Sequence, residues 1–224
     1  MPKRIKRPSV RDGYDRWSAQ YDRTPNPLVA LDRRHTVKLL RPQRGERLLD
    51  AGCGTGAHLE WMLAAGSRPV GLDLWHGMLQ IARRKYPTVP VVQADLHVPL
   101  PVRRDWFDAV LCALVGEHLS QLALLFREFH ATLVTGGRLV FSVFHPEMAA
   151  AGIEANFELA GTEYRLGAER HTVADYRDLI SQAGFRDLKV HEFRGDEALV
   201  QEMPDAKKYL DRPLLLAITA HANR

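Results

Sequence analysis

The sequence has few cysteines and no long apolar run. Cys53 and Cys112 are the two cysteines among 224 residues, too few for a disulfide framework, and no CxxC pair offers a metal site. We therefore expect a reducing compartment. The basic N-terminus is not followed by the apolar run of a secretory signal, and no uncharged stretch approaches a bilayer-spanning length. These absences predict a soluble, cytoplasmic protein without a membrane span.

The composition that remains is that of an ordinary globular protein, with 46% hydrophobic and 26% charged residues. The length suits one large domain. Much of the net charge of +4 comes from an N-terminal basic arm, in which the cations are Lys3, Arg4, Lys6, Arg7 and Arg11. We expect this arm to be solvated and partly disordered; contact with phosphate or an acidic partner is the alternative.

Short apolar runs alternate with segments of helical periodicity along most of the chain. Helices are predicted over 58–65, 77–85, 122–133 and 172–183, and strands over 47–50, 69–73, 89–94, 107–112, 139–144, 188–193 and 214–220. Such alternation is typical of an α/β, Rossmann-like, doubly wound sheet with seven strands. A ligand crevice should lie at the carboxyl ends of the strands.

Two segments fall outside this alternation and are candidates for a substrate cover. Residues 1–40 are predicted to form the arm and a helical lid, and residues 41–224 a single domain with a cover insertion at 145–171. Tyr14, Trp17 and Tyr21 lie on one helical face, which fits a lid or a packing stripe against the sheet. Glu163 and Tyr164, in the insertion, are candidates to touch the substrate.

A glycine-rich loop follows the first predicted strand, in the order Asp-Ala-Gly-Cys-Gly-Thr-Gly from Asp50. Glycines let the backbone turn sharply and approach a ligand closely. Gly52, Gly54 and Ala57 also satisfy the dinucleotide fingerprint, so NAD has to be considered. Asp50 argues against NAD, because a carboxylate there would face a pyrophosphate at close range. It would suit an ammonium group instead.

Two further acids follow the next two predicted strands. Asp73 can accept both ribose hydroxyls, and Asp95 is placed to accept from an exocyclic amine. A helix cap or loop acid is the plain alternative for each. A ligand that combines an amine, a ribose and an adenine is S-adenosylmethionine.

These motifs, taken together, resemble those of the class I S-adenosylmethionine-dependent methyltransferases. The resemblance covers about residues 47–146 and is nearest to the ubiquinone/menaquinone-type small-molecule subgroup. It rests on the glycine loop, on Val70-Gly71-Leu72-Asp73, on Ala94-Asp95-Leu96, on residues 107–119 and on Gly136-Gly137. It implies a mostly parallel sheet with an antiparallel last strand and an N-terminal helical cover. It further implies S-adenosylmethionine as cofactor, with S-adenosylhomocysteine as product, bound by Tyr21, Asp50, Gly52, Cys53, Gly54, Gly56, Asp73, Leu74, Met78, Ala94, Asp95, Leu96 and Ala113.

The catalytic residues are less well defined by the sequence. Methyl transfer from a sulfonium needs alignment and, for some acceptors, a base, but no metal, and no cluster with metal-ligand spacing is present. His118, His145 and His171 are the candidates, and each could equally be structural.

A small organic acceptor with an oxygen, carbon or nitrogen nucleophile is the favoured substrate. The alternatives are an RNA or protein methyltransferase, suggested by the basic arm, and a non-catalytic methyltransferase-like or dinucleotide-binding module. Against RNA, the Asn/Asp-Pro-Pro-aromatic signature of many base methyltransferases is absent after residue 112. Nucleic acid is therefore possible but not favoured, and a monomer or homodimer is expected.

Overall fold

A computed structural model describes residues 4–8, 10–154, 156–167 and 169–223. Its centre is a seven-stranded sheet in the order β4-β3-β2-β5-β6-β10-β9. The strands are β2 (Arg47–Ala51), β3 (Arg68–Asp73), β4 (Val91–Gln93), β5 (Phe107–Ala113), β6 (Leu133–Phe144), β9 (Phe185–Arg194) and β10 (Pro213–Ala222). All neighbours are parallel except at β10, which is antiparallel to β6 and β9. The predicted fold class is therefore confirmed.

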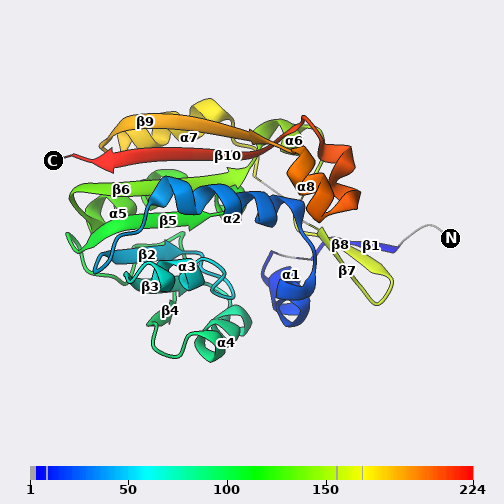
Figure 1. Cartoon of the computed structure of the whole chain (residues 1–224), viewed down its shortest axis with the longest axis horizontal. Coiled ribbons are helices and arrows are strands. Elements are labelled where there is room, and N and C mark those ends of the chain that lie inside the picture. The colour runs from blue at the N-terminus through cyan, green and yellow to red at the C-terminus, as the bar shows by residue number, and fades with distance from the viewer. Residues whose placement is uncertain (1–3, 9, 155, 168, 224) are drawn as a thin grey trace.

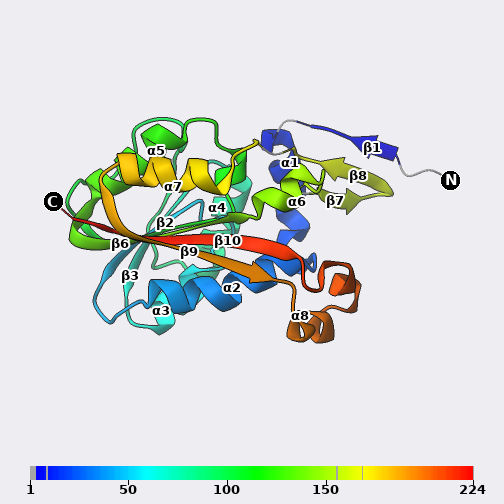
Figure 2. The same ribbon diagram turned by 90° about the horizontal axis from the view of Figure 1, so that it is seen from above.

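Helices cover both faces of this sheet (Figure 2). On one face α5 (Leu122–Thr132) and α7 (Val173–Gln182) bury their apolar stripes. On the other lie α2 (Pro27–Leu40), α3 (Leu59–Ala64) and α4 (His76–Lys85). Double coverage explains why β2 and β5 read as continuous apolar runs, with Leu48, Leu49, Val110 and Leu111 inaccessible to solvent.

The predicted lid boundary at residue 40 is too late in the chain. Helix α2 packs along β6 and β10 (Figure 1), with Leu31 and Leu40 fully buried. Asn26 caps this helix by accepting from the amides of Leu28 and Val29, and Pro27 occupies its first turn. The cover formed by the N-terminal segment is therefore limited to α1 (Val10–Trp17) and the 3₁₀ helix η1 (Ser18–Arg23).

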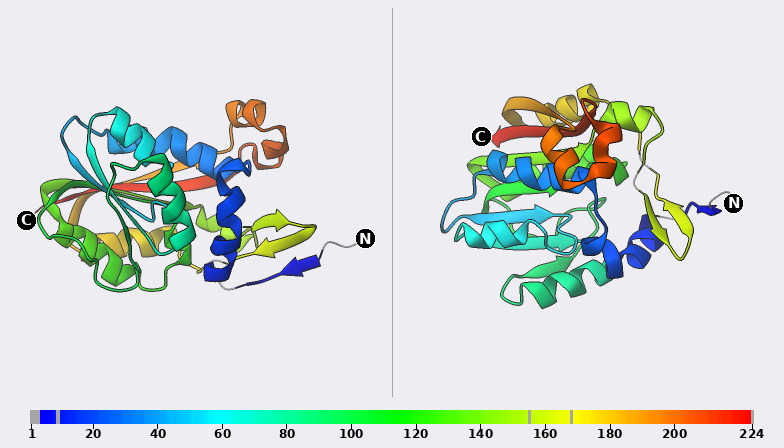
Figure 3. Two further views of the ribbon diagram at one scale, coloured as in Figure 1. Left: turned by 90° about the horizontal axis from the view of Figure 1, so that it is seen from below. Right: turned by 45° about the vertical axis from the view of Figure 1, so that its right-hand side comes forward.

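A second, three-stranded sheet extends the cover, and the sequence analysis missed it. It has the order β1-β8-β7, formed by β1 (Arg4–Lys6), β8 (Thr162–Arg165) and β7 (Asn156–Leu159). Ala160 and Gly161, both at positive φ, join β7 to β8 in a two-residue turn. Figure 3 shows this sheet projecting beside α1. The insertion predicted to be irregular thus contains this hairpin, after α6 (Pro146–Ala150).

The expectation of a disordered arm is wrong for residues 4–7. Strand β1 pairs in parallel with β8, and Arg7 forms an ion pair with Glu154, with an Nη2–Oε1 distance of 2.7 Å. The ammonium of Lys6 lies 5.9 Å from the centre of the Tyr164 ring. Lys3 lies outside the described residues. Part of the positive charge of the arm is therefore engaged in contacts within the molecule.

A third segment outside the alternating pattern joins β9 to β10. It forms α8 (Glu197–Glu202) and the 3₁₀ helix η3 (Pro204–Tyr209), which lie beside the N-terminal end of α2 (Figure 1). The sequence pattern had indicated two segments outside the alternation, residues 1–40 and 145–171. None of the helices in the described ranges combines the length and apolarity needed to cross a bilayer.

Candidate active site

The glycine loop after β2 has a backbone that only glycine adopts easily. Gly52, Gly54 and Gly56 have φ values of 88°, 52° and 86°, in the left-handed region that L side chains avoid. A Cβ on Gly52 would also lie 2.3 Å from a methyl carbon of Val115. The amide of Gly52 donates to the carbonyl of Leu72 at 2.7 Å. The loop is thereby fixed against β3 at the carboxyl edge of the sheet.

Asp73, the last residue of β3, is held by backbone amides beside this loop. Its Oδ2 accepts from the Gly54 amide and its Oδ1 from the Trp75 amide, both at 2.8 Å. Burial raises the pKa of Asp73 to about 6, although these hydrogen bonds act in the opposite direction. The carboxylate is thus pre-oriented and partly desolvated, which suits a ligand that donates to it.

Asp50 is completely buried, and neither carboxyl oxygen has a hydrogen-bond partner among the described residues. Burial raises the pKa of Asp50 to about 6, His58 lowers it, and the neighbouring Asp73 and Asp32 raise it further. A buried carboxyl without a partner is costly unless a ligand completes it. Asp50 therefore adds a buried negative charge beside the glycine loop, although its side chain has no exposed surface through which to contact a ligand.

A cavity of about 190 Å³ opens in front of the loop. It brings together nine of the residues predicted to bind the cofactor: Tyr21, Gly52, Gly54, Asp73, Leu74, Met78, Asp95, Leu96 and Ala113. Cys53, Gly56 and Ala94 do not line it, and neither does Asp50. Cys53 is buried, and its Sγ would lie 2.7 Å from a Cβ built on Gly71, so it acts in packing.

At one end of this cavity, Asp95 and His97 form a polar pair. Asp95 Oδ1 accepts from the His97 amide at 2.8 Å and contacts the ring Nδ1 at 2.9 Å. Burial acts to raise the pKa of Asp95, but the contacts with His97 outweigh it and hold the pKa below its ordinary value. The carboxylate therefore stays charged, with Oδ2 available to a ligand.

A stack of aromatic rings connects the cavity to the cover. Tyr14 lines the cavity, between Trp75 and Trp17, at ring-centre distances of 6.4 and 5.7 Å. Trp17 then stacks on Phe157 at 5.0 Å, and Phe157 on Tyr164 at 4.9 Å. The structure thus brings the N-terminal segment and the insertion together through Trp17 and Phe157, above the carboxyl ends of the strands.

The far end of η1 is fastened to the glycine loop by Asp22. Its Oδ1 accepts from the Thr55 hydroxyl at 2.6 Å, and its Oδ2 pairs with the Lys85 ammonium at 2.8 Å. Lys85 also donates to the Thr55 carbonyl at 3.2 Å. These contacts fix the end of η1 to the glycine loop and to α4.

Of the three candidate histidines, only His118 lines the cavity. Burial lowers the pKa of His118 to about 4, so the ring is neutral near pH 7. Its Nε2 lies 3.0 Å from the Tyr14 hydroxyl. This contact ties the 3₁₀ helix η2 (Gly116–His118) to the cover.

His145, the second candidate for a catalytic role, does not line the cavity. Its side chain is 1% exposed, and Nδ1 accepts from the Glu147 amide at 3.3 Å as the N-cap of α6. His171 is also directed elsewhere, with Nε2 3.0 Å from the Leu119 carbonyl. Glu163 pairs with Arg165 at 2.7 Å on β8 and lines neither this cavity nor the second one described below.

A buried polar network behind the loop was missed in the sequence. Asp32, on α2, has no exposed surface; Oδ2 lies 2.9 Å from His58 Nε2, and Oδ1 accepts from the Ser142 hydroxyl at 2.6 Å. Burial alone would lower the pKa of His58, but the contacts with Asp32 and the charge of Asp50 raise it. The three partners come from distant parts of the chain, so no local pattern marks them.

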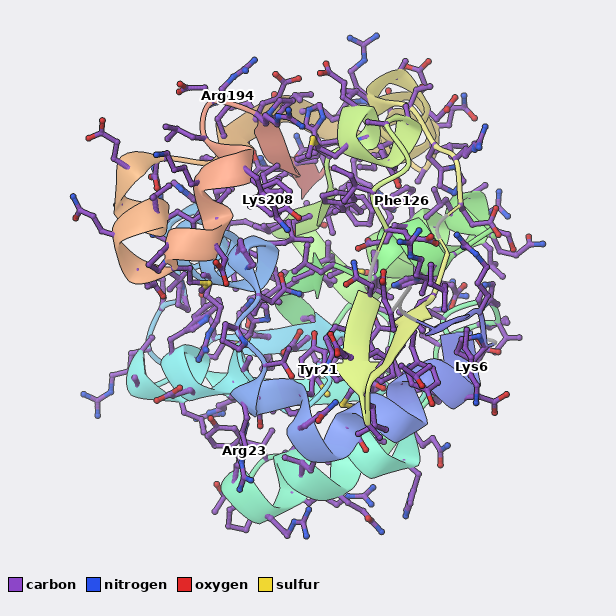
Figure 4. All side chains as sticks on the ribbon, turned by 90° about the vertical axis from the view of Figure 1, so that its right-hand side faces the viewer. Lys6, Tyr21, Arg23, Phe126, Arg194 and Lys208 are labelled. Atoms are coloured by element: carbon purple, nitrogen blue, oxygen red, sulfur yellow. The ribbon has the colours of Figure 1, made fainter. Side chains whose placement is uncertain are left out.

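A second cavity, of about 470 Å³, was also missed. It is enclosed by residues 24–28, by the start of the insertion and by the α8–η3 segment, and Trp17, Glu117 and Phe144 lie in its wall. Figure 4 looks onto this side of the molecule, with Tyr21 and Lys208 labelled. The two cavities meet neighbouring residues of η2, because Glu117 lines the second and His118 the first.

The sequence and the fold are both similar to those of known methyltransferases. Residues 49–141 match the family described as a methyltransferase domain. An S-adenosylmethionine-dependent methyltransferase from Mesorhizobium loti has the same fold, with a TM-score of 0.68 and 26% identity over 94% of this chain and 99% of its own. Residues 49–141 therefore match a methyltransferase domain, and the fold is that of an S-adenosylmethionine-dependent methyltransferase, as the motifs indicated.

Two curated methyltransferases are about 30% identical to part of this chain. The malonyl-[acyl-carrier protein] O-methyltransferase of Serratia marcescens is 30% identical over 174 residues, 76% of this chain and 63% of its own length. The demethylmenaquinone methyltransferase of Tropheryma whipplei is 31% identical over 150 residues, 63% of this chain and 62% of its own. The chain thus spans just under two thirds of the length of these relatives, whose acceptors differ from one another.

Proposed function

We propose that this protein transfers a methyl group from S-adenosylmethionine to a small organic acceptor. The observation that carries the proposal is a pair of cavities lined by neighbouring residues of η2: one at the glycine loop, with Asp73 and Asp95 in its wall, and a second, partly apolar one under the cover. A concave site that encloses most of its ligand suits a small molecule better than a polymer.

The residues of the first cavity fit the three chemical parts of the cofactor. Asp73 would accept hydrogen bonds from the ribose hydroxyls, and Asp95 from the adenine amino group through Oδ2. Asp50, buried and without a hydrogen-bond partner in the described part of the chain, would supply negative charge that complements the methionine ammonium through the loop. The bound cofactor supplies a methyl group already activated by the sulfonium, so the protein's task is to align the acceptor and exclude water.

The cover would exclude water from the site. We propose that α1, η1 and the β7–β8 hairpin act as a lid over both cavities, hinged where Asp22 binds the glycine loop. The stack from Trp75 through Tyr14 and Trp17 to Phe157 supports this role, because it places large apolar rings between the cofactor cavity and solvent. The basic residues Lys6 and Arg7 already have partners within the cover, which weakens the case for nucleic acid.

The proposal can be tested with methyl-tritiated S-adenosylmethionine. The protein is incubated with separate small-molecule, RNA and protein fractions of a cell extract, and the label is followed. We expect transfer to the small-molecule fraction, and loss of transfer in Asp73→Ala. Label that appears in RNA or protein instead would contradict the proposal.

A further inference from the structure

The side chain of Glu117 is a buried carboxyl in the wall of the second cavity. It is 8% exposed and belongs to η2, the single turn whose residues line both this cavity and the cofactor cavity. Its neighbour His118 faces the cofactor side. A group bound against Glu117 would therefore lie next to the cofactor cavity.

Within the described part of the chain, Glu117 has no cationic partner. It forms no ion pair, and Oε2 is buried without a hydrogen-bond donor, while the backbone amides of Glu117 and Phe144 contribute hydrogen bonds to the carboxylate. Burial raises the pKa of Glu117 to about 7. Burying a charge without a counter-ion is costly. A cationic ligand in this cavity would remove that cost.

The other charges of the cavity do not supply this cation. Glu154 is paired with Arg7 at 2.7 Å, and Glu202 with Arg34 at 3.4 Å. Asp205 and Lys208, both on η3, contribute one charge of each sign. The cavity therefore has a negative excess centred on Glu117, although the chain as a whole carries a net charge of +4.

Around these charges part of the wall of the cavity is apolar. Trp17, Leu28, Phe144, Ile153, Met203 and Leu214 line it. A ligand that fits would have a hydrophobic body and one positive group. A carboxylate or phosphate on the ligand would face Glu117 and be repelled.

We propose that the methyl acceptor is a small amine with an apolar body, which binds as its ammonium ion against Glu117, and that Glu117 accepts the proton the nitrogen must lose. This inference rests on the proposed function. The ammonium gives one proton to the Glu117 carboxylate, which becomes neutral, and the nitrogen recovers its lone pair. The nitrogen–methyl bond then forms as the sulfur–methyl bond breaks. The electron pair stays on sulfur as a thioether, and the product is the methylated ammonium.

The test uses matched probes that share one body and differ in one group: phenethylamine, 2-phenylethanol and 3-phenylpropionate. Their binding to the full chain saturated with S-adenosylhomocysteine is measured by calorimetry at pH 8, without turnover. We expect the amine to bind at least about tenfold more tightly than the alcohol and the carboxylate, as a buried charge pair should contribute. In Glu117→Gln this preference should disappear, whereas S-adenosylhomocysteine should bind as in the wild type.

Glu202→Gln is the matched control, because it removes an exposed acid at the same cavity that is already paired with Arg34; we expect less than about a threefold change in amine binding. A wild-type chain that binds the alcohol or the carboxylate as well as the amine would overturn the inference, and this comparison needs no variant. Unchanged amine preference in Glu117→Gln would overturn it as well. Failure of the wild type to bind S-adenosylhomocysteine would instead refute the proposed function itself.

Discussion

The buried network around Asp32 allows a quantitative prediction for the stability of the site. Removing the Ser142 hydroxyl, in Ser142→Ala, takes away the only side-chain donor that the described residues offer to Asp32 Oδ1, a contact of 2.6 Å among fully buried atoms. Since hydrogen bonds to charged groups contribute about 1.5–3 kcal/mol, we expect the free energy of unfolding to fall by that amount. For a chain of this size, the melting temperature should fall by about 2–4 °C for each kcal/mol.

A matched control separates the charge effect from the loss of any buried hydroxyl. Ser67 is also buried and donates at 2.6 Å, but to the neutral carbonyl of Met62. Ser67→Ala should therefore cost about 0.5–1.5 kcal/mol. Urea unfolding, monitored by circular dichroism for both variants, makes the comparison. A cost for Ser142→Ala no greater than that for Ser67→Ala would refute a charge-assisted hydrogen bond between Ser142 and Asp32.

The same network has a pH signature with a defined sign. The pKa of His58 is raised above its ordinary value of 6.5 in the folded state. A raised histidine pKa stabilises the fold fully below the unfolded pKa, and this contribution is lost as the pH rises through the folded pKa. The stability difference between wild type and His58→Gln should therefore shrink as the pH is raised from about 6 to about 9, which urea titrations at several pH values would detect; a difference that grows with pH would contradict the assignment.

Three further predictions concern the cofactor cavity and the cover. Asp73→Ala should weaken S-adenosylhomocysteine binding by about 1.5–3 kcal/mol, measured by calorimetry, because it removes charge-assisted hydrogen bonds; an unchanged affinity would remove Asp73 from the site. Wild-type affinity for the same ligand should rise between pH 5 and pH 7, since Asp50 and Asp73, each with a pKa of about 6, become charged in that window; affinity that falls would be inconsistent with a bound ammonium. Amide hydrogen exchange over residues 10–23 should slow when S-adenosylhomocysteine binds, and equal exchange rates with and without it would leave the lid without support.

The sequence was most informative where structure depends on short-range patterns. The alternating apolar runs predicted the sheet and its flanking helices, because parallel strands buried on both faces leave a continuous hydrophobic signal. The glycine loop and the acids at positions 73 and 95 were found because each follows directly on a strand. Their side chains consequently meet at one edge of the sheet.

The sequence was least informative where function depends on contacts between distant segments. Asp32 lies in a helix that looked like part of a lid, and only the packing of α2 on β6 brings it to His58 and Ser142. His145 looked well placed at the end of a strand, but it caps a helix. Glu117 was visible next to His118, yet its burial and its cavity depend on the α8–η3 segment, which carried no recognisable motif.

The most direct test of the account is the comparison of S-adenosylhomocysteine with NAD as ligands of the purified chain, by calorimetry at pH 8. The glycine loop alone is compatible with either ligand. Asp50, which is buried beside that loop and has no hydrogen-bond partner among the described residues, favours an ammonium and disfavours a pyrophosphate. We predict stoichiometric binding of S-adenosylhomocysteine, with NAD weaker by at least about a hundredfold. Equal or tighter binding of NAD would contradict the assignment of this site to S-adenosylmethionine.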